Sequence, residues 1–319
     1  MLNFSRLIYP LSTKLFVEEY WQQRPLIVRD RDRDYYSDLV KTSDINRMIY
    51  TLQPDWTKMR LIKKGGFLAS NYMNADGSPN LIPVYNAYQK GYSIILYDLE
   101  KRWSSLSALS RNLEDFFNHA VNVNSYLTPA NSQALNPHFN WEERLILQVE
   151  GVKRWRIYKP LETPQLQSRK ATNDTALHRE TLPPLEMEVC LEPGDFLYLP
   201  GGWGSEAFTG ACSSLHLSVG VFLYTWGDLL AALLSSLRQE NIDFRRALPA
   251  GFLNEGTINS EQMERLLQAI AEQTDLDSAI KVLKKKLLAR TSNPLPNDDF
   301  QRLDSANVKA ALARQIQSE

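Results

Sequence analysis

The amino-acid sequence predicts a mainly β protein with α-helices, built around a jelly roll of two β-sheets. Short runs rich in β-branched and aromatic residues follow one another between residues 121 and 225, separated by turns such as PGD and PGG. The segment before this region mixes helical and extended patterns, whereas the segment after it is helical throughout. We therefore expect one domain over residues 1–225 and a helical appendage over residues 226–319.

The N-terminal segment predicts an α/β decoration of the jelly roll. Helical spacing of apolar residues, short apolar runs and Gly or Pro breakers define its elements. In order, these are a helix ending before Pro25, a buried strand at 26–28, a charged helical stretch at 31–55, a strand at 60–64 leading into Gly65-Gly66, a loop at 69–80, a strand at 91–99 and an amphipathic helix at 103–120.

The central region contains the candidate strands of the jelly roll. In order, they are NVNSYLT, RLILQVEG, KRWRIYK, LEMEVCLE, DFLYLP and SSLHLSVGVFLY. Their short length and regular turn signals favour a double-sheet jelly roll of the cupin type.

The C-terminal segment carries helical periodicity. Its predicted elements are helices at 226–239, 260–273, 275–290 and 306–317, with a loop at 292–299. The first of these helices gathers its leucines on one face. Leucine-rich helical hairpins often dimerise, and docking within the chain is an equally ordinary alternative. We expect a homodimer.

The composition excludes several classes of protein. Apolar residues make up 43% and charged residues 23%, and the formal net charge is -1, so nothing indicates binding to nucleic acid or to an anionic membrane. No secretory signal or membrane-spanning run is visible, and we expect a cytoplasmic location. The two cysteines, Cys190 and Cys212, exclude a disulfide framework and are expected in the core.

The tripeptide His138-Phe139-Asn140 is the first candidate for a functional site. Residues two apart in an extended strand point the same way, so His138 and Asn140 are expected to face one cavity. A non-haem iron(II) site requires two imidazoles and one carboxylate on one side of the metal. An H-x-D pair would supply part of this set, but here an amide takes the place of the carboxylate.

Other polar residues are expected to face the same cavity. Lys153 follows in the next strand and can hold a carboxylate as a point charge. Asn124 and Tyr126 lie on an earlier strand and can hydrogen-bond the same ligand. His216 lies between apolar neighbours on a later strand, either as a core histidine with a hydrogen-bond partner or as a ligand.

Longer segments show a family pattern: YWQQRPLIV, NSYLTP, the H-x-N pair, LILQVEGVKRWRIY, LEPGDFLYLPGGW, WGDLL and LPAGFL. Together they resemble the JmjC-type cupin oxygenases, in the branch that contains the bacterial and eukaryotic ribosomal oxygenases. The resemblance extends over most of the chain. It implies a double-stranded β-helix that uses iron(II) and 2-oxoglutarate to hydroxylate a protein side chain.

The resemblance also implies the iron ligands, which are the His and Asp of an H-x-D motif and a later His. His138 keeps the first ligand position. Asn140 stands where the family has Asp, and Ser205 stands where it has the later His. Two of the three ligands are therefore replaced by neutral groups that are poor donors to iron(II).

The residues that the resemblance assigns to 2-oxoglutarate match the family better than the iron ligands do. The family's partner for the cofactor's carboxylate falls on Lys153, and Asn124 and Tyr126 also match. The sequence thus favours 2-oxoglutarate as a ligand and argues against iron(II).

Three functions stay open at this point. The first is a noncanonical or pseudo-oxygenase that keeps an acid- or peptide-binding pocket. The second is an active hydroxylase of a protein, peptide or amino-acid residue, with a metal site rebuilt from His138, His216 and a carboxylate of Glu206 or Glu142. The third is metal-free chemistry, for which no nucleophile–base pair is visible. The expected substrate is a protein, a peptide or a small molecule.

The ligand positions that the resemblance implies can be tested by restoring the two replaced ligands. If Asn140 and Ser205 hold the two lost ligand positions, Asn140→Asp together with Ser205→His should raise the affinity for iron sharply.

Overall fold

The computed structural model describes residues 2–51, 56–68, 74, 80–160, 182–254, 260–272 and 275–291. The chain divides into two compact units, one built on the residues up to Phe222 and one that begins at Leu223. The domain boundary predicted between residues 225 and 226 falls shortly after this division. No helix among the described residues is long and apolar enough to cross a membrane.

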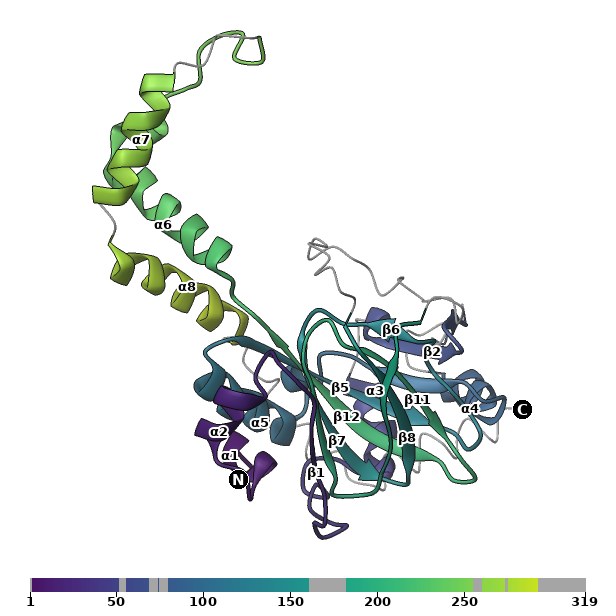
Figure 1. The fold of residues 1–319 in the computed structure, drawn as a ribbon. Helices are drawn as coiled ribbons and strands as arrows, with labels where there is room; N and C mark the ends of the chain where they lie inside the picture. The colour runs from purple at the N-terminus through teal and green to yellow at the C-terminus, as the bar shows by residue number, and fades with distance from the viewer. Residues whose placement is uncertain are drawn as a thin grey trace. The chain divides into compact units, whose positions relative to one another are not determined.

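Two antiparallel sheets form the first unit (Figure 1). The larger sheet has the strand order β1-β10-β7-β12-β5-β4-β2-β3, and the smaller sheet has the order β6-β11-β8-β9. The strands are β1 (Leu26–Val28), β2 (Met59–Lys63), β3 (Gly66–Phe67), β4 (Ser93–Leu96), β5 (Ala120–Thr128), β6 (His138–Phe139), β7 (Glu143–Glu150), β8 (Lys153–Tyr158), β9 (Leu185–Leu191), β10 (Phe196–Leu199), β11 (Gly204–Thr209) and β12 (Ser214–Phe222). The predicted two-sheet jelly roll is confirmed.

Apolar side chains from both sheets form the core between them. Ile146, Leu197 and Leu199 of the larger sheet and Trp155, Ile157, Val189 and Leu191 of the smaller sheet make one buried cluster. Because side chains alternate between the faces of a strand, Tyr198 points away from this cluster. Its ring meets Phe16 with centroids 4.9 Å apart. The smaller sheet therefore covers one face of the larger sheet, and N-terminal helices cover the other.

The helices of the first unit are α1 (Phe4–Ile8), α2 (Thr13–Glu19), α3 (Ile45–Thr51), α4 (Leu81–Gln89) and α5 (Ser104–Phe117). α1, α4 and the strand β11 were not predicted. The charged helix predicted from residue 31 begins only at Ile45 in the described part, because the preceding Asp- and Ser-containing stretch forms turns, which these side chains favour. The strand predicted at 91–99 is confined to Ser93–Leu96.

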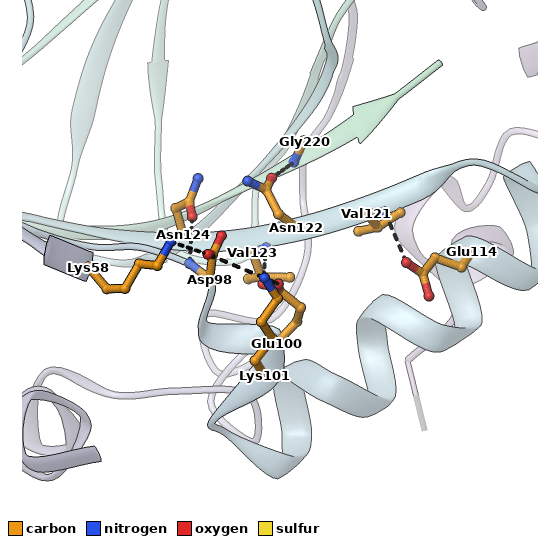
Figure 2. A network of polar contacts seen from close by, with 10 residues as sticks. All are labelled: Lys58, Asp98, Glu100, Lys101, Glu114, Val121, Asn122, Val123, Asn124 and Gly220. Carbon is orange, nitrogen blue, oxygen red and sulfur yellow. Dashed lines mark hydrogen bonds and ion pairs between the residues drawn. The ribbon is translucent and has the colours of Figure 1, made fainter. Parts of the chain in front are cut away.

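A polar network caps the open edge of β5 (Figure 2). β4 pairs only with residues 125–127 of β5, so no strand of the described residues lies beside the earlier residues of β5 on that side. There the N–H of Val121 donates to Glu114 Oε1 at 3.1 Å, and the N–H of Val123 donates to Glu100 Oε2 at 2.8 Å. Two carboxylates thus satisfy backbone donors that would otherwise be buried without an acceptor.

The second unit contains α6 (Trp226–Glu240), α7 (Ser260–Glu272) and α8 (Leu276–Thr291), which confirms three of the predicted helices. The loop predicted at 292–299 and the helix predicted at 306–317 lie outside the described residues. One face of α6 supplies Leu233 and Leu237 to a core shared with Ala279 of α8. A second stripe on α6, formed by Trp226, Leu230 and Leu234, is exposed by 82%, 56% and 41%.

The prediction that both cysteines are buried is wrong. Cys190 and Cys212 are exposed free thiols. Cys190 lies between buried Val189 and Leu191 on β9, so strand alternation turns its side chain outward. Cys212 lies in the turn that precedes β12.

We predict that Glu100→Ala lowers the free energy of unfolding by about 1–3 kcal/mol, because the buried N–H of Val123 loses its acceptor. Glu100→Gln keeps an acceptor oxygen at this place, so its loss should be clearly smaller. Urea unfolding of the two variants beside the unchanged protein measures both effects. Equal losses in the two variants would contradict this account of the β5 edge.

Candidate functional site

A small cavity of about 30 Å³ lies between the two sheets. Its lining residues are Tyr126, Ala134, Leu135, His138, Arg144, Lys153, Trp155, Glu206, Ala207 and His216. This is room for roughly two water molecules or one carboxylate group. It is far below the roughly 300 Å³ of the smaller drug-sized ligand pockets.

The β6–β11 pairing brings the three expected ligand positions together. His138 lies directly opposite Ser205 in this pair, so the first and third positions are cross-strand neighbours. Asn140 follows β6 at once, and its carbonyl oxygen accepts the N–H of Gly202 at 2.7 Å. Ser205 lies within β11, a strand that the sequence did not predict, and it is fully buried.

Arg144 fills the space beside these positions, a role that was not predicted from the sequence. Its side chain is buried on β7, and Nη2 donates to Ser205 Oγ at 3.2 Å. The hydrogen-bonding surroundings orient the Asn140 amide with its oxygen accepting from Arg144 Nη2 and its nitrogen 3.3 Å from Glu142 Oε1. The signal was present in the sequence, since Arg144 directly precedes the apolar run 145–147 and shares a face of β7 with Ile146.

His138 is a neutral imidazole at this site. Its Nδ1 donates to the carbonyl oxygen of Asn136 at 2.8 Å, so Nε2 of the neutral ring carries no proton. Burial, together with the nearby charge of Arg144, lowers the pKa of His138 to about 4. At neutral pH the ring therefore carries no charge of its own.

Lys153 is a buried cation at the start of β8. The turn before it requires Gly151, whose φ is 65°. Only 1% of Lys153 is exposed, and its Nζ donates to Thr128 Oγ1 at 2.8 Å. Burial lowers the pKa of Lys153 to about 7. No carboxylate of the described residues lies within ion-pair distance of this ammonium.

His216 has the surroundings of a core histidine with a hydrogen-bond partner. Its ring stacks on Tyr126 with centroids 4.9 Å apart and meets the edge of Trp155 at 5.4 Å. Its Nδ1 lies 3.4 Å from Lys153 Nζ and so serves as the acceptor. Burial, followed by the charges of Lys153 and Arg144, holds the pKa of His216 well below its usual range.

Asn124 lies outside the cavity, although the sequence analysis expected it beside Tyr126. Its side-chain oxygen accepts the backbone N–H of Asp98 at 3.1 Å (Figure 2). Of the two polar residues predicted on β5, only Tyr126 therefore lines the site.

The donors at the site do not fit iron(II). Glu206 lines the cavity, but its carboxylate accepts from Tyr158 Oη at 2.8 Å and from Gln133 Nε2 at 2.9 Å. Within the described ranges, no group of three or more His, Cys, Asp and Glu side chains is arranged to hold a metal ion. One imidazole, one amide and one hydroxyl remain, beside a guanidinium that repels a divalent cation. Lys153, by contrast, is suited to a carboxylate.

Comparisons with known proteins place this site in a family context. Residues 99–229 match the family described as the JmjC domain. The chain is 28% identical over 317 residues to the bifunctional lysine-specific demethylase and histidyl-hydroxylase NO66 of Aedes aegypti, which covers 94% of this chain and 50% of that protein. It is 30% identical over 258 residues to human ribosomal oxygenase 1, which covers 79% of this chain and 40% of that protein. The chain thus spans half the length, or less, of these curated relatives.

Solved structures share the fold. The X-ray structure of YcfD from Escherichia coli matches with a TM-score of 0.60 and 16% identity, covering 90% of this chain and 74% of that one. A second structure of that ribosomal oxygenase, in complex with cobalt and 2-oxoglutarate, matches with a TM-score of 0.56 and 15% identity, covering 90% and 73%. These structures support the fold alone. The match of residues 99–229 to the JmjC domain and the similarity to the curated relatives show that the chain belongs to the JmjC-domain cupin family.

Proposed function

We propose that this chain is a noncanonical JmjC-domain protein, a pseudo-oxygenase, whose pocket binds the carboxylate of an acid without iron. The carboxylate belongs to a small acid such as 2-oxoglutarate or to an acidic side chain of a peptide or protein. One relative supports a protein as the partner, and another supports 2-oxoglutarate as the acid. The NO66 proteins are named for demethylation of lysine and hydroxylation of histidine, and YcfD has been solved with 2-oxoglutarate.

The observation that carries the proposal is the unpaired ammonium of Lys153. A buried charge without a counter-ion is costly, and proteins retain such groups mainly where a ligand or a reaction uses them. The cost is visible in the lowered pKa of Lys153. Thr128 holds the ammonium in place through one hydrogen bond, which leaves further N–H donors for an anion.

The rest of the lining favours an anion as well. The buried indole N–H of Trp155 has no acceptor in the part of the chain that the structure describes, and indole, ammonium and guanidinium groups can only donate. Glu206 is the one carboxylate among the described residues of the lining, and its bonds to Tyr158 and Gln133 engage both of its oxygens. A ligand carboxylate would thus meet donors from Lys153, Trp155 and Arg144.

The alternative is an active hydroxylase with a rebuilt metal site. The observation in its favour is that His138, His216 and Glu206 all line the same cavity. Against it stand the bonds that already engage Glu206 and the contact between His216 and Lys153. Anaerobic titration with iron(II) in the presence of 2-oxoglutarate, followed by a succinate assay in air, separates the two functions. Stoichiometric iron with iron-dependent succinate formation would overturn our proposal.

We predict that metal-depleted protein binds 2-oxoglutarate or a shorter acid and that Lys153→Met weakens this binding by about tenfold or more, since a charge-assisted hydrogen bond is lost. Calorimetric titration in the presence of a chelator measures both affinities. Lys159→Met, which removes an exposed lysine of the same chain, is the matched control. Lys153→Met should also fold at least as stably as the unchanged protein, because it removes a buried charge.

We predict that the affinity for the acid falls as the pH rises above about 7. A bound anion raises the pKa of Lys153 from its free value of about 7, so binding takes up a proton in this range and weakens by up to about tenfold per pH unit. The other groups facing Lys153 are His216 and Arg144 of the larger sheet and His138 and Glu206 of the smaller sheet. Both histidines stay neutral in this range because their pKa values are lowered.

Titrations between about pH 6 and pH 9 test this pH dependence. Lys153→Arg keeps a permanent charge, so any binding it retains should no longer vary with pH above 7. An affinity that stays constant with pH in the unchanged protein would show that Lys153 is not the group that binds the acid.

We further propose that the chain acts in the cytoplasm as a homodimer joined through the exposed stripe of α6. Leu230→Glu together with Leu234→Glu should convert the dimer into a monomer, because charges on this stripe cannot be buried at an interface. Ser235→Glu with Gln239→Glu, on the opposite side of the helix, is the matched control. Light scattering during size-exclusion chromatography reports the mass, and a monomeric unchanged protein would contradict this proposal.

A further inference from the structure

We propose that the guanidinium of Arg144 takes the place of the iron, so that this pocket carries a built-in cation instead of a bound metal. The ligand that this cation serves, together with Lys153, is a carboxylate group. The assignment of Arg144 to the metal position stands on its own, whereas the ligand step rests on the proposed function.

The contacts of Arg144 place it at the centre of the former ligand set. One nitrogen, Nη2, donates both to Ser205 Oγ and to the amide oxygen of Asn140. These are the two positions at which this chain departs from the family's iron ligands. The third position, His138, lies directly across the β6–β11 pair from Ser205. The side chains that would have surrounded a metal therefore surround the guanidinium.

The charges of the site agree with this exchange. A divalent iron with one aspartate carries a net charge of +1, and so does one guanidinium with a neutral asparagine. The loss of the carboxylate and the gain of the arginine thus leave the charge of the buried site unchanged. Amide and hydroxyl oxygens are poor ligands for iron(II) but ordinary acceptors for a guanidinium. The smaller side chain of Ser205 also leaves space that an imidazole would fill.

Arg144 keeps capacity for a ligand. No carboxylate of the described residues forms an ion pair with it, and Glu142 acts on it only at longer range. Its remaining N–H groups have no partner among the described residues, although Arg144 lines the cavity with Lys153. A guanidinium binds carboxylates through paired N–H donors, and Lys153 adds a second positive charge from the facing sheet.

A guanidinium at the metal position changes the effect expected of the substitutions that restore the two lost iron ligands. The sequence alone predicts that Asn140→Asp with Ser205→His suffices to recover metal binding. With Arg144 in place, the double variant still presents a cation where the metal must sit. We expect the double variant to bind cobalt(II) weakly, and the triple variant that adds Arg144→Ala to bind it about a hundredfold or more tightly.

Anaerobic titration with cobalt(II), followed by its visible absorption, measures this difference. The matched control is the double variant with Arg154→Ala, which removes an exposed arginine from β8 and should leave cobalt binding as weak as in the double variant. Thermal unfolding by circular dichroism shows that each variant is folded, and Arg144→Val replaces Arg144→Ala if the alanine variant is not. A triple variant that binds cobalt no better than the double variant overturns the assignment of Arg144 to the metal position.

Binding of an acid provides a second test of this proposal. In otherwise unchanged protein, Arg144→Ala should weaken binding of 2-oxoglutarate by about tenfold or more, and millimolar guanidinium ion should restore it. The same ion should not rescue Lys153→Met. Loss of binding without rescue overturns the direct contact between Arg144 and the ligand. If the unchanged protein binds no acid while the triple variant binds cobalt, the proposed function fails and the assignment of Arg144 stands.

Discussion

Burial of two cations between the sheets, Arg144 and Lys153, is the constraint on which the rest of the site depends. Each carries its charge in a place with little water and no carboxylate ion pair among the described residues. Burial lowers the pKa of His216, and the charges of Lys153 and Arg144 lower it further. Burial and the charge of Arg144 likewise lower the pKa of His138. They also oppose entry of a divalent metal and favour an anion. The chemistry of this pocket therefore follows from its charge before any single ligand is considered.

The fold supplies the rigid frame that such a site requires. Trp155 and Ile157 of the smaller sheet pack on Ile146 of the larger sheet, which fixes the spacing between the two sheets. The register of β6 with β11 sets His138 against Ser205, and the turn at Gly151 starts β8 at Lys153. Side chains held by paired strands keep their positions without a ligand, so the arrangement of donors is organised in advance.

The sequence and the structure agree where a pattern is local, and they differ where strands must meet. The alternation in β5 and β12, the apolar run in β7 and the periodicity of α5 to α8 were readable along the chain. The strand β11 was missed, because GSEAFT is short and lacks a clear alternation, and pairing with β6 and β8 is what makes it a strand. The exposure of Cys190 was likewise decided by the face of β9 on which it falls.

The sequence by itself determined the fold class and the family resemblance, and through the resemblance it predicts that Asn140 and Ser205 stand at two iron-ligand positions, since these follow from residue identity and spacing. Only the tertiary structure decided which side chains share the cavity, because the alternation of a strand does not tell which strand lies opposite. It set Asn124 apart from Tyr126, bound His216 to Lys153, and brought Arg144 to the two altered ligand positions. An arginine at the start of an apolar strand has no evident role until the β6–β11 pair places acceptors around its guanidinium.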